Sequence, residues 1–256
     1  FTLSALPSSN PFRIYRHPSD DVWLVISGVG KAAAAAAVAH LAAVSDVGPA
    51  HGWVNVGICG HHQAPVGTPL RAHKVLDVGS GKSWYPTLLD HCLCETDTVR
   101  TVDKPDAQYA VPGMVDMEAS GFYESALRYT SQELVQVIKV VSDNPHRPVV
   151  RFQSKEVVRL IEEAYDAIEA LIMGVGNLSK AEGERLADPP GFHAFQDRWR
   201  FSASQQVQLR KLLGAWVALR GEAAEPSQYS AHGTSRDVIR QLTARLEASR
   251  VSWDAS

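Results

Sequence analysis

Two short segments near the start of the chain alternate between hydrophobic and polar residues, and a long run of small residues follows them. Residues 11–16 and 22–27 have the alternation and the β-branched content of strands, with a polar, proline-containing turn between them. They predict a β-hairpin. From Lys31 the chain continues with alanines as far as Leu41, which predicts a helix whose smooth surface can pack closely on a sheet.

Apolar strand-like segments and helical segments then alternate along the chain. Residues 53–58 and 74–78 predict buried strands, residues 115–129 begin extended and become helical, and residues 134–141 are almost unbroken in their hydrophobicity. This alternation predicts an α/β fold of three layers, with a central mixed β-sheet flanked by helices. Ligands bind at the carboxyl ends of the strands in such sheets, so functional residues are expected directly after the strands.

The pattern changes beyond residue 154. Residues 156–172, 204–219 and 235–246 have apolar residues at helical spacing, separated by stretches rich in Pro, Gly and Ala. We therefore expect two regions: an α/β domain over residues 1–153, and a helical C-terminal extension over residues 154–256 that packs on it.

Composition narrows the classes of function. The chain has 256 residues, of which 45% are hydrophobic, enough for a large core. Its 25 Lys and Arg nearly balance its 28 Asp and Glu, with no block of either sign, so neither nucleic acid nor a membrane surface is an expected partner. The most apolar stretch, residues 32–44, is too short to cross a bilayer. Three cysteines at irregular spacing suit a reducing compartment, and we expect a soluble, cytoplasmic protein.

The segment Gly-Val-Gly-Lys-Ala-Ala at residues 28–33 satisfies a variant of the dinucleotide-binding fingerprint and raises the hypothesis of an NAD(P)-dependent oxidoreductase. The acidic residue expected about 20 positions further on, at the end of the next strand, is absent. A tight turn with close packing of the helix on the sheet explains the glycines more simply.

Two acidic segments follow predicted strands. In the first, Glu118 could accept hydrogen bonds from vicinal sugar hydroxyls while Met117 packs on the apolar face of the ring, although an acidic first turn of a helix has the same sequence. In the second, Ser142 and Asp143 end the most hydrophobic strand. A carboxyl group at the rim of an apolar pocket suits general-acid chemistry, whereas an Asx turn is the structural alternative.

The histidines do not indicate a metal site. His61 and His62 are adjacent in sequence, and the His-Cys-Leu-Cys segment at residues 91–94 lacks the paired spacing of zinc ligands. We expect neither a metal nor a cofactor.

Four segments, taken in order, resemble the nucleoside phosphorylase superfamily, especially its methylthioadenosine/adenosylhomocysteine nucleosidases. They are Ser-Gly-Val-Gly-Lys at residues 27–31 with its alanine helix, Asn-Val-Gly-Ile-Cys-Gly at residues 55–60, Val-Asp-Met-Glu-Ala at residues 115–119, and Val-Ser-Asp at residues 141–143. The resemblance covers residues 13–144.

The resemblance implies roles for particular residues. Met117 and Glu118 would line the ribose site, and Asp143 would face a purine and help to protonate its N7. The matching segments also place Gly57, Cys59, Gly60 and Ser142 at the ligand, where the glycines let backbone N–H groups approach it. A nucleoside-like small molecule is thus the expected ligand, and a homodimer or higher homo-oligomer is expected because members of the family pair across the active site.

The chain departs from the family pattern at several points. Ile58 replaces a hydroxyl residue that the family uses, which puts phosphate as a co-substrate in doubt. Lys139 stands where an arginine is common, and the family's first strand, with its water-activating or phosphate-binding residue, would precede Phe1. The leading hypothesis is cleavage of a purine N-glycosidic bond, by hydrolysis rather than phosphorolysis. A non-catalytic nucleoside-binding protein on the same fold is the alternative.

Overall fold

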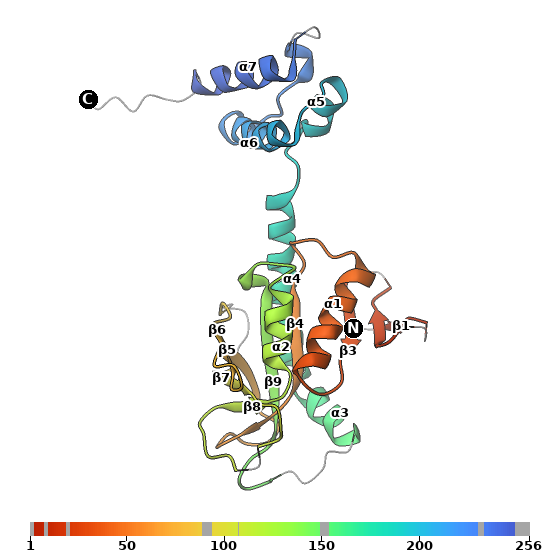
Figure 1. The fold of residues 1–256 in the computed structure, drawn as a ribbon, viewed down its shortest axis with the longest axis vertical. Helices are drawn as coiled ribbons and strands as arrows, with labels where there is room; N and C mark the ends of the chain where they lie inside the picture. Colours follow the sequence, from red (N-terminus) through yellow and green to blue (C-terminus); the bar gives the residue numbers. More distant parts are fainter. Residues whose placement is uncertain are drawn as a thin grey trace, which may run out of the picture. The chain divides into compact units, whose positions relative to one another are not determined.

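The structure is a computed structural model, and it describes residues 3–7, 10–18, 21–88, 94–106, 108–148, 154–229 and 233–248. The chain forms two compact units, Phe1–Arg185 and Leu186–Ser256. Figure 1 shows the elements of both units. The strands are β1 (Ser4–Ala5), β2 (Arg13–Arg16), β3 (Trp23–Ile26), β4 (Trp53–His61), β5 (Pro69–Asp77), β6 (Ser83–Trp84), β7 (Thr96–Thr101), β8 (Met114–Asp116) and β9 (Val135–Asp143). The α-helices are α1 (Lys31–Ser45), α2 (Ala119–Ala126), α3 (Ser154–Glu163), α4 (Tyr165–Leu186), α5 (Phe192–Arg198), α6 (Ala203–Arg220) and α7 (Ser235–Glu247).

The strands of the first unit form two sheets. β1, β2 and β3 are antiparallel, and β2 and β3 are the predicted hairpin. The larger sheet has the order β6-β5-β7-β8-β4-β9, and β9 pairs with β5 as well, so that five of its strands close into a ring. β4 is parallel to β9 but antiparallel to β8. The prediction of a mixed central sheet is confirmed.

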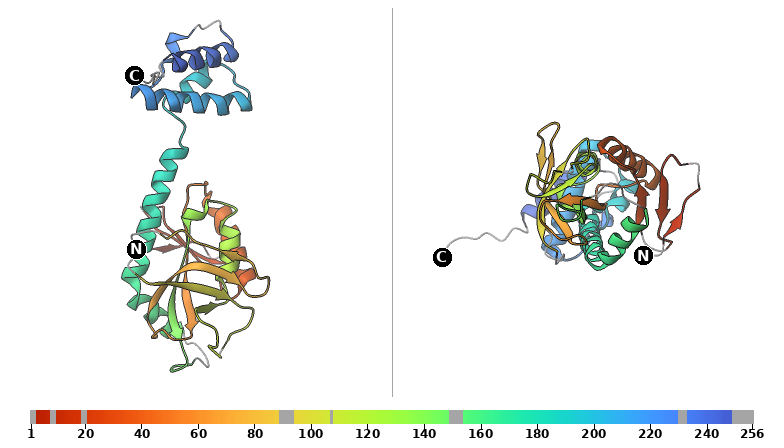
Figure 2. Two further views of the ribbon diagram at one scale, coloured as in Figure 1. Left: turned by 90° about the vertical axis from the view of Figure 1, so that its left-hand side faces the viewer. Right: turned by 90° about the horizontal axis from the view of Figure 1, so that it is seen from below.

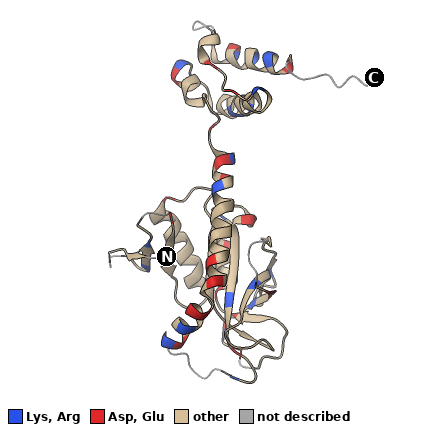
Figure 3. Ribbon diagram, turned by 180° about the vertical axis from the view of Figure 1, so that it is seen from behind, with Lys and Arg blue, Asp and Glu red and all other residues tan. Residues whose placement is uncertain are grey.

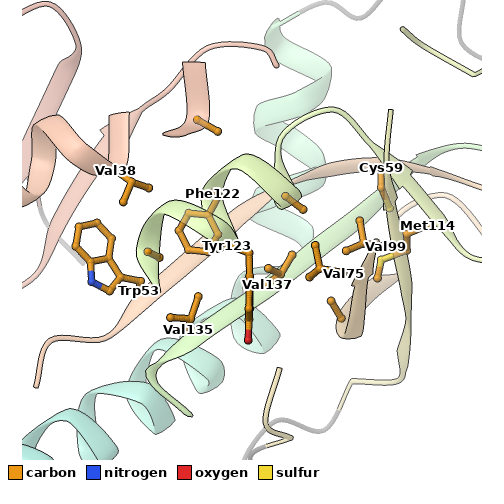
Figure 4. Packing of buried hydrophobic residues seen from close by; sticks show 14 of the residues in the cluster. Val38, Trp53, Cys59, Val75, Val99, Met114, Phe122, Tyr123, Val135 and Val137 are labelled. Atoms are coloured by element: carbon orange, nitrogen blue, oxygen red, sulfur yellow. The ribbon is translucent and has the colours of Figure 1, made fainter. Parts of the chain in front are cut away.

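Helices cover both faces of the larger sheet, as the fold class requires (Figure 2). The two faces of β9 make this plain, because its successive side chains point in opposite directions. Val135 and Val137 pack with α1 and α2, and Figure 4 shows Phe122 and Tyr123 of α2 beside them. Ile138 and Val140 pack instead with α3 and α4. The largely hydrophobic sequence of this strand therefore reflects burial on both sides.

A groove separates β3 from β4. It has a volume of about 180 Å³ and is lined by both strands, by α1 and by Phe122. β3 pairs only with β2, and residues 53–59 of β4 pair only with β9, so within the described chain both strands keep one open edge. The two sheets are thus joined by packing on α1 rather than by strand pairing.

The second unit is a small helical bundle with its own core. Phe195, Leu209, Leu213, Tyr229 and Leu242 are buried together in it. Capping boxes begin α6 and α7, where each cap residue and the residue three positions later bond to each other's backbone N–H.

No helix of the described residues is long and apolar enough to cross a membrane. Lys and Arg are interspersed with Asp and Glu along α3 and α7 (Figure 3).

The structure differs from the sequence expectations in its boundaries. The units divide after Arg185, further along the chain than the predicted division between 153 and 154, because α3 and α4 pack on the sheet of the first unit. The helix predicted over residues 156–172 is two helices that meet at Ala164, and the second continues to Leu186. β7 and α5 were not predicted.

Candidate functional site

Asp143 lies at the carboxyl end of β9, next to Gly60 of β4 in the sheet register. It is 8% exposed, and both of its carboxyl oxygens have hydroxyl partners. Tyr109 Oη donates to Oδ2 at 2.7 Å, and Ser142 Oγ lies 2.6 Å from Oδ1. No lysine or arginine of the described chain forms an ion pair with this carboxyl group.

The Ser142 hydroxyl contacts two acceptors but carries one hydrogen. Besides Asp143 Oδ1, it lies 3.0 Å from the carbonyl oxygen of Cys59. When Ser142 donates to Cys59, a proton on Asp143 can satisfy the other contact by donating to Ser142 Oγ. The arrangement therefore accommodates a protonated Asp143 without a change in geometry.

Beside Asp143, β4 carries Gly60, which has no side chain, and Cys59, whose side chain lies in the core. A Cβ on Gly60 would lie 2.8 Å from Asp143 Oδ2, so only glycine leaves room for the carboxyl group. The Cys59 thiol is buried in the core, and burial raises its pKa. The contact of Cys59 with the site is made by its carbonyl oxygen, which accepts from Ser142 Oγ. Ile58 points to the opposite face, where it packs against the cluster that α3 and α4 form.

A buried ion pair connects β8 to β9. Lys139 Nζ lies 2.8 Å from Asp116 Oδ2, and both side chains are almost fully buried. Asp116 also accepts hydrogen bonds from Thr101 Oγ1 and from the backbone of Ala119, the first residue of α2. A Cβ on Gly57 would lie 3.1 Å from Lys139 Nζ, so this glycine makes room for the lysine.

Glu118 precedes α2 and contacts the start of α1. Its Oε1 accepts the backbone N–H of Gly30 at 2.8 Å, and Gly30 has a φ of 104°, which favours glycine. Glu118 and the preceding Met117 are half-buried. Because a carboxylate already occupies the N–H of Gly30, this turn is poorly suited to an anionic pyrophosphate, which argues against the oxidoreductase hypothesis.

Lys31, the first residue of α1, is also paired with carboxylates. Its Nζ lies 3.1 Å from Asp77 Oδ2 and 2.8 Å from Asp103 Oδ1. Asp77 further accepts the Ser120 hydroxyl and the Ser80 backbone N–H. Desolvation alone would raise the pKa of Asp77, but these donors lower it to about 2. The cluster ties β5 to the starts of α1 and α2.

Comparison with known proteins places this arrangement in a known fold. No family model matches the chain, and no curated protein sequence is significantly similar to it. Solved structures are similar to it. The methylthioadenosine/S-adenosylhomocysteine nucleosidase of Colwellia psychrerythraea, in complex with adenine, is 18% identical with a TM-score of 0.50 over 70% of this chain and 87% of that chain.

The fold is that of the methylthioadenosine/S-adenosylhomocysteine nucleosidases. An S-adenosylhomocysteine nucleosidase of Streptococcus pyogenes, in complex with 5-methylthiotubericidin, is 16% identical with a TM-score of 0.50 over 69% of this chain and 88% of that chain. The futalosine hydrolase of Helicobacter pylori is 10% identical with a TM-score of 0.51 over 66% of this chain and 87% of that chain. The resemblance read from four sequence segments is thus confirmed at the level of the fold.

Within this nucleosidase fold, the sequence-derived site residues belong to two contact groups. Asp143, Ser142, Cys59 and Gly60 are in direct contact at the ends of β9 and β4. Glu118 contacts the turn before α1, and the buried Asp116–Lys139 pair fixes the strand that leads to it. The structure gives Met117 no polar partner among the described residues. That Met117 packs on the apolar face of a sugar ring stays a prediction.

Sequence reasoning missed Tyr109 and the cluster around Asp77. Nothing in the residues near Tyr109 marks it, because it is an isolated aromatic in a polar segment. Asp77 could have been found, since it is the last residue of a strand that leads into a Gly/Ser loop. Among the described residues no three His, Cys, Asp or Glu side chains gather as metal ligands, and residues 91–93 of the His-Cys-Leu-Cys segment lie outside the described chain.

Proposed function

We propose that this protein hydrolyses the N-glycosidic bond of a purine nucleoside. The observation that carries the proposal is the environment of Asp143, a buried carboxyl group with hydroxyl partners and no ion-pair partner in the described chain. Such a group can hold a proton and deliver it, as a general acid does. The nucleosidase fold supports the choice of substrate class, because the adenine complex shows a purine bound by a protein of this fold.

Each site residue has a defined part in the proposed reaction. As the bond between C1′ and the base nitrogen breaks, Asp143 transfers its proton to the leaving purine. A water oxygen forms the new bond to C1′ and that water releases a proton to solvent, from which Asp143 takes up a proton for the next turnover. Glu118, held through Oε1 by Gly30, offers Oε2 to the sugar hydroxyls, and Met117 packs on the sugar. These contacts lower the barrier when they strengthen in the oxocarbenium-like transition state.

Hydrolysis is preferred to phosphorolysis because two lysines at this edge of the sheet, Lys31 and Lys139, are already neutralised. Lys31 is bound to two aspartates, and Lys139 is buried against Asp116. An incoming phosphate would need positive charge or free backbone donors. We therefore propose water, rather than phosphate, as the nucleophile.

The test is release of free base from a panel of adenosine, inosine and methylthioadenosine, with and without phosphate, followed by chromatography. We expect release without phosphate, and a loss of roughly 10²-fold or more in kcat for Asp143→Asn. Asp197→Asn, an exposed aspartate of α5, is the control and should keep full activity. Absence of free base with every nucleoside would reject the proposal.

A second candidate is a protein that binds nucleosides without cleaving them. It is favoured by the engagement of both Asp143 oxygens by protein hydroxyls. Calorimetry that detects nucleoside binding, together with no turnover in the same samples, would support this candidate. Turnover that Asp143→Asn abolishes would exclude it.

A further inference from the structure

Tyr109 is a buried residue in an otherwise polar and exposed stretch of chain. Of the described residues from Asp103 to Pro112, it alone is buried, at 8% exposure, whereas the others are exposed or half-buried. The stretch is fixed at both ends: Val102 N–H bonds to the Asp116 carbonyl, and Gly113 N–H bonds to His62 Nδ1. Between these ends, Tyr109 is the residue that reaches back to the sheet.

The side chain of Tyr109 ends on the carboxyl group that the proposed chemistry needs. Its hydroxyl donates to Asp143 Oδ2 at 2.7 Å, and its ring lies close enough to β4 that a Cβ on Gly60 would come within 3.4 Å of Cε1. Ser142 occupies the other oxygen. With Tyr109 in place, Asp143 is buried and each of its oxygens has a hydroxyl partner.

The backbone of Tyr109 is in an unusual conformation. Its φ is 50°, in the left-handed region that a bulky residue rarely adopts. A conformation of this kind persists when surrounding contacts hold it, and it is often found at switching or ligand-gating positions. The hydrogen bond to Asp143 is such a contact, and movement of Tyr109 away from Asp143 would allow the strain to relax.

We propose that Tyr109 covers Asp143 in the free protein and that a purine must displace it to reach the acid. Tyr109 then sets the affinity and selectivity of the site, because the purine competes with the tyrosine for the same oxygen. The part of the proposal that concerns the purine rests on the proposed function, whereas the covering of Asp143 stands by itself. The apparent affinity is reduced by the fraction of molecules in which the site is covered.

The first experiment tests the cover without any nucleoside. Exposed carboxyl groups of the full chain are coupled to glycinamide with a carbodiimide, and the modified positions are quantified by mass spectrometry. Asp143 should be protected in the wild type and should react at least about fivefold faster in Tyr109→Ala. Equal labelling in the two proteins would overturn the proposal. Circular dichroism and the thermal midpoint establish that the variant is folded.

The second experiment measures adenine binding by calorimetry. Removal of the hydrogen bond between Tyr109 and Asp143 should raise the uncovered population about fivefold, so Tyr109→Phe and Tyr109→Ala should bind adenine at least about fivefold more tightly than the wild type. Tyr165→Phe is the matched control, because Tyr165 Oη also donates to a carboxylate, that of Glu169, on the exposed surface of α4.

The outcomes separate the two proposals. Tighter adenine binding in the Tyr109 variants supports both. Adenine binding that is equal in all proteins overturns the competition and leaves the nucleosidase proposal standing. If Asp143 labelling increases but neither adenine nor any nucleoside binds, Tyr109 is a cover of Asp143 and the proposed purine chemistry is rejected.

Discussion

Asp77 is a carboxylate held ionised by its neighbours, and this makes its contribution to stability dependent on pH. Burial would raise its pKa, but the Ser80 N–H, the Ser120 hydroxyl and Lys31 lower it from 3.8 to about 2. A group with a lowered folded-state pKa stabilises the fold above its unfolded pKa, and this stabilisation is lost as the pH falls through the folded value. The stabilisation by Asp77 is therefore lost as the pH falls from about 4 to about 2.

We expect Asp77→Asn to lower the free energy of unfolding by about 2 kcal/mol at pH 6, with a difference from the wild type that shrinks toward pH 2. Urea unfolding at a series of pH values measures it. Asp197→Asn, exposed on α5, should show no such dependence. A difference that stays constant from pH 6 to pH 2 would contradict the assignment of the effect to ionised Asp77.

Two glycines of β4 should respond differently to alanine. In Gly60→Ala the new methyl group falls 2.8 Å from Asp143 Oδ2, so the carboxyl group must move away from Ser142 or Tyr109. We expect a loss of at least about tenfold in nucleosidase kcat/KM. In Gly57→Ala the methyl group meets Lys139 Nζ at 3.1 Å, and we expect a loss of about 1–3 kcal/mol in stability instead. Steady-state kinetics and urea unfolding of both variants distinguish these effects.

At the scale of elements, the Lys139–Asp116 pair connects β9 to β8 and to the start of α2. Lys139→Met leaves a buried carboxylate without its cation, and we expect it to cost about 3–5 kcal/mol in unfolding free energy. Adding Asp116→Asn should recover part of this loss, because the amide oxygen can still accept from Thr101 and no charge remains buried. A double-mutant cycle measures the coupling, and additive effects of the two changes would contradict it.

Several elements could be predicted because their sequence pattern matches their burial. The alternation in β2 and β3 gives the hairpin, and the almost unbroken apolar run of β9 reflects a strand buried on both faces. β7 was missed because its sequence, Thr-Asp-Thr-Val-Arg-Thr, carries no apolar alternation, and its position in the sheet is fixed by β5 and β8 on either side. Tyr109 and Asp143 are 34 residues apart in the chain, and no local sequence pattern predicts a contact between them.

At the scale of the whole molecule, the described residues form three hydrophobic clusters, of which two lie on opposite faces of β9 in the first unit and one lies in the second unit. The core residues of the second unit, from Phe192 to Leu246, pack among themselves, as expected for a unit that can fold independently. The helical pattern of the sequence identified α6 and α7 of this unit but not the short α5. It placed the division between the regions too early, because an amphipathic helix looks alike in sequence whether it covers a sheet or another helix.

Leu213→Ala tests whether the two units are energetically independent. Leu213 is fully buried in α6, so we expect its truncation to destabilise the second unit by about 2–5 kcal/mol, whereas Leu219→Ala on the same helix, at a side chain 53% exposed, should cost less than about 0.5 kcal/mol. Native-state hydrogen exchange measures each unit separately. Amides of α5, α6 and α7 should exchange faster in Leu213→Ala, and those of β4 and β9 should be unchanged. Faster exchange in β9 would show that both units unfold as one cooperative structure.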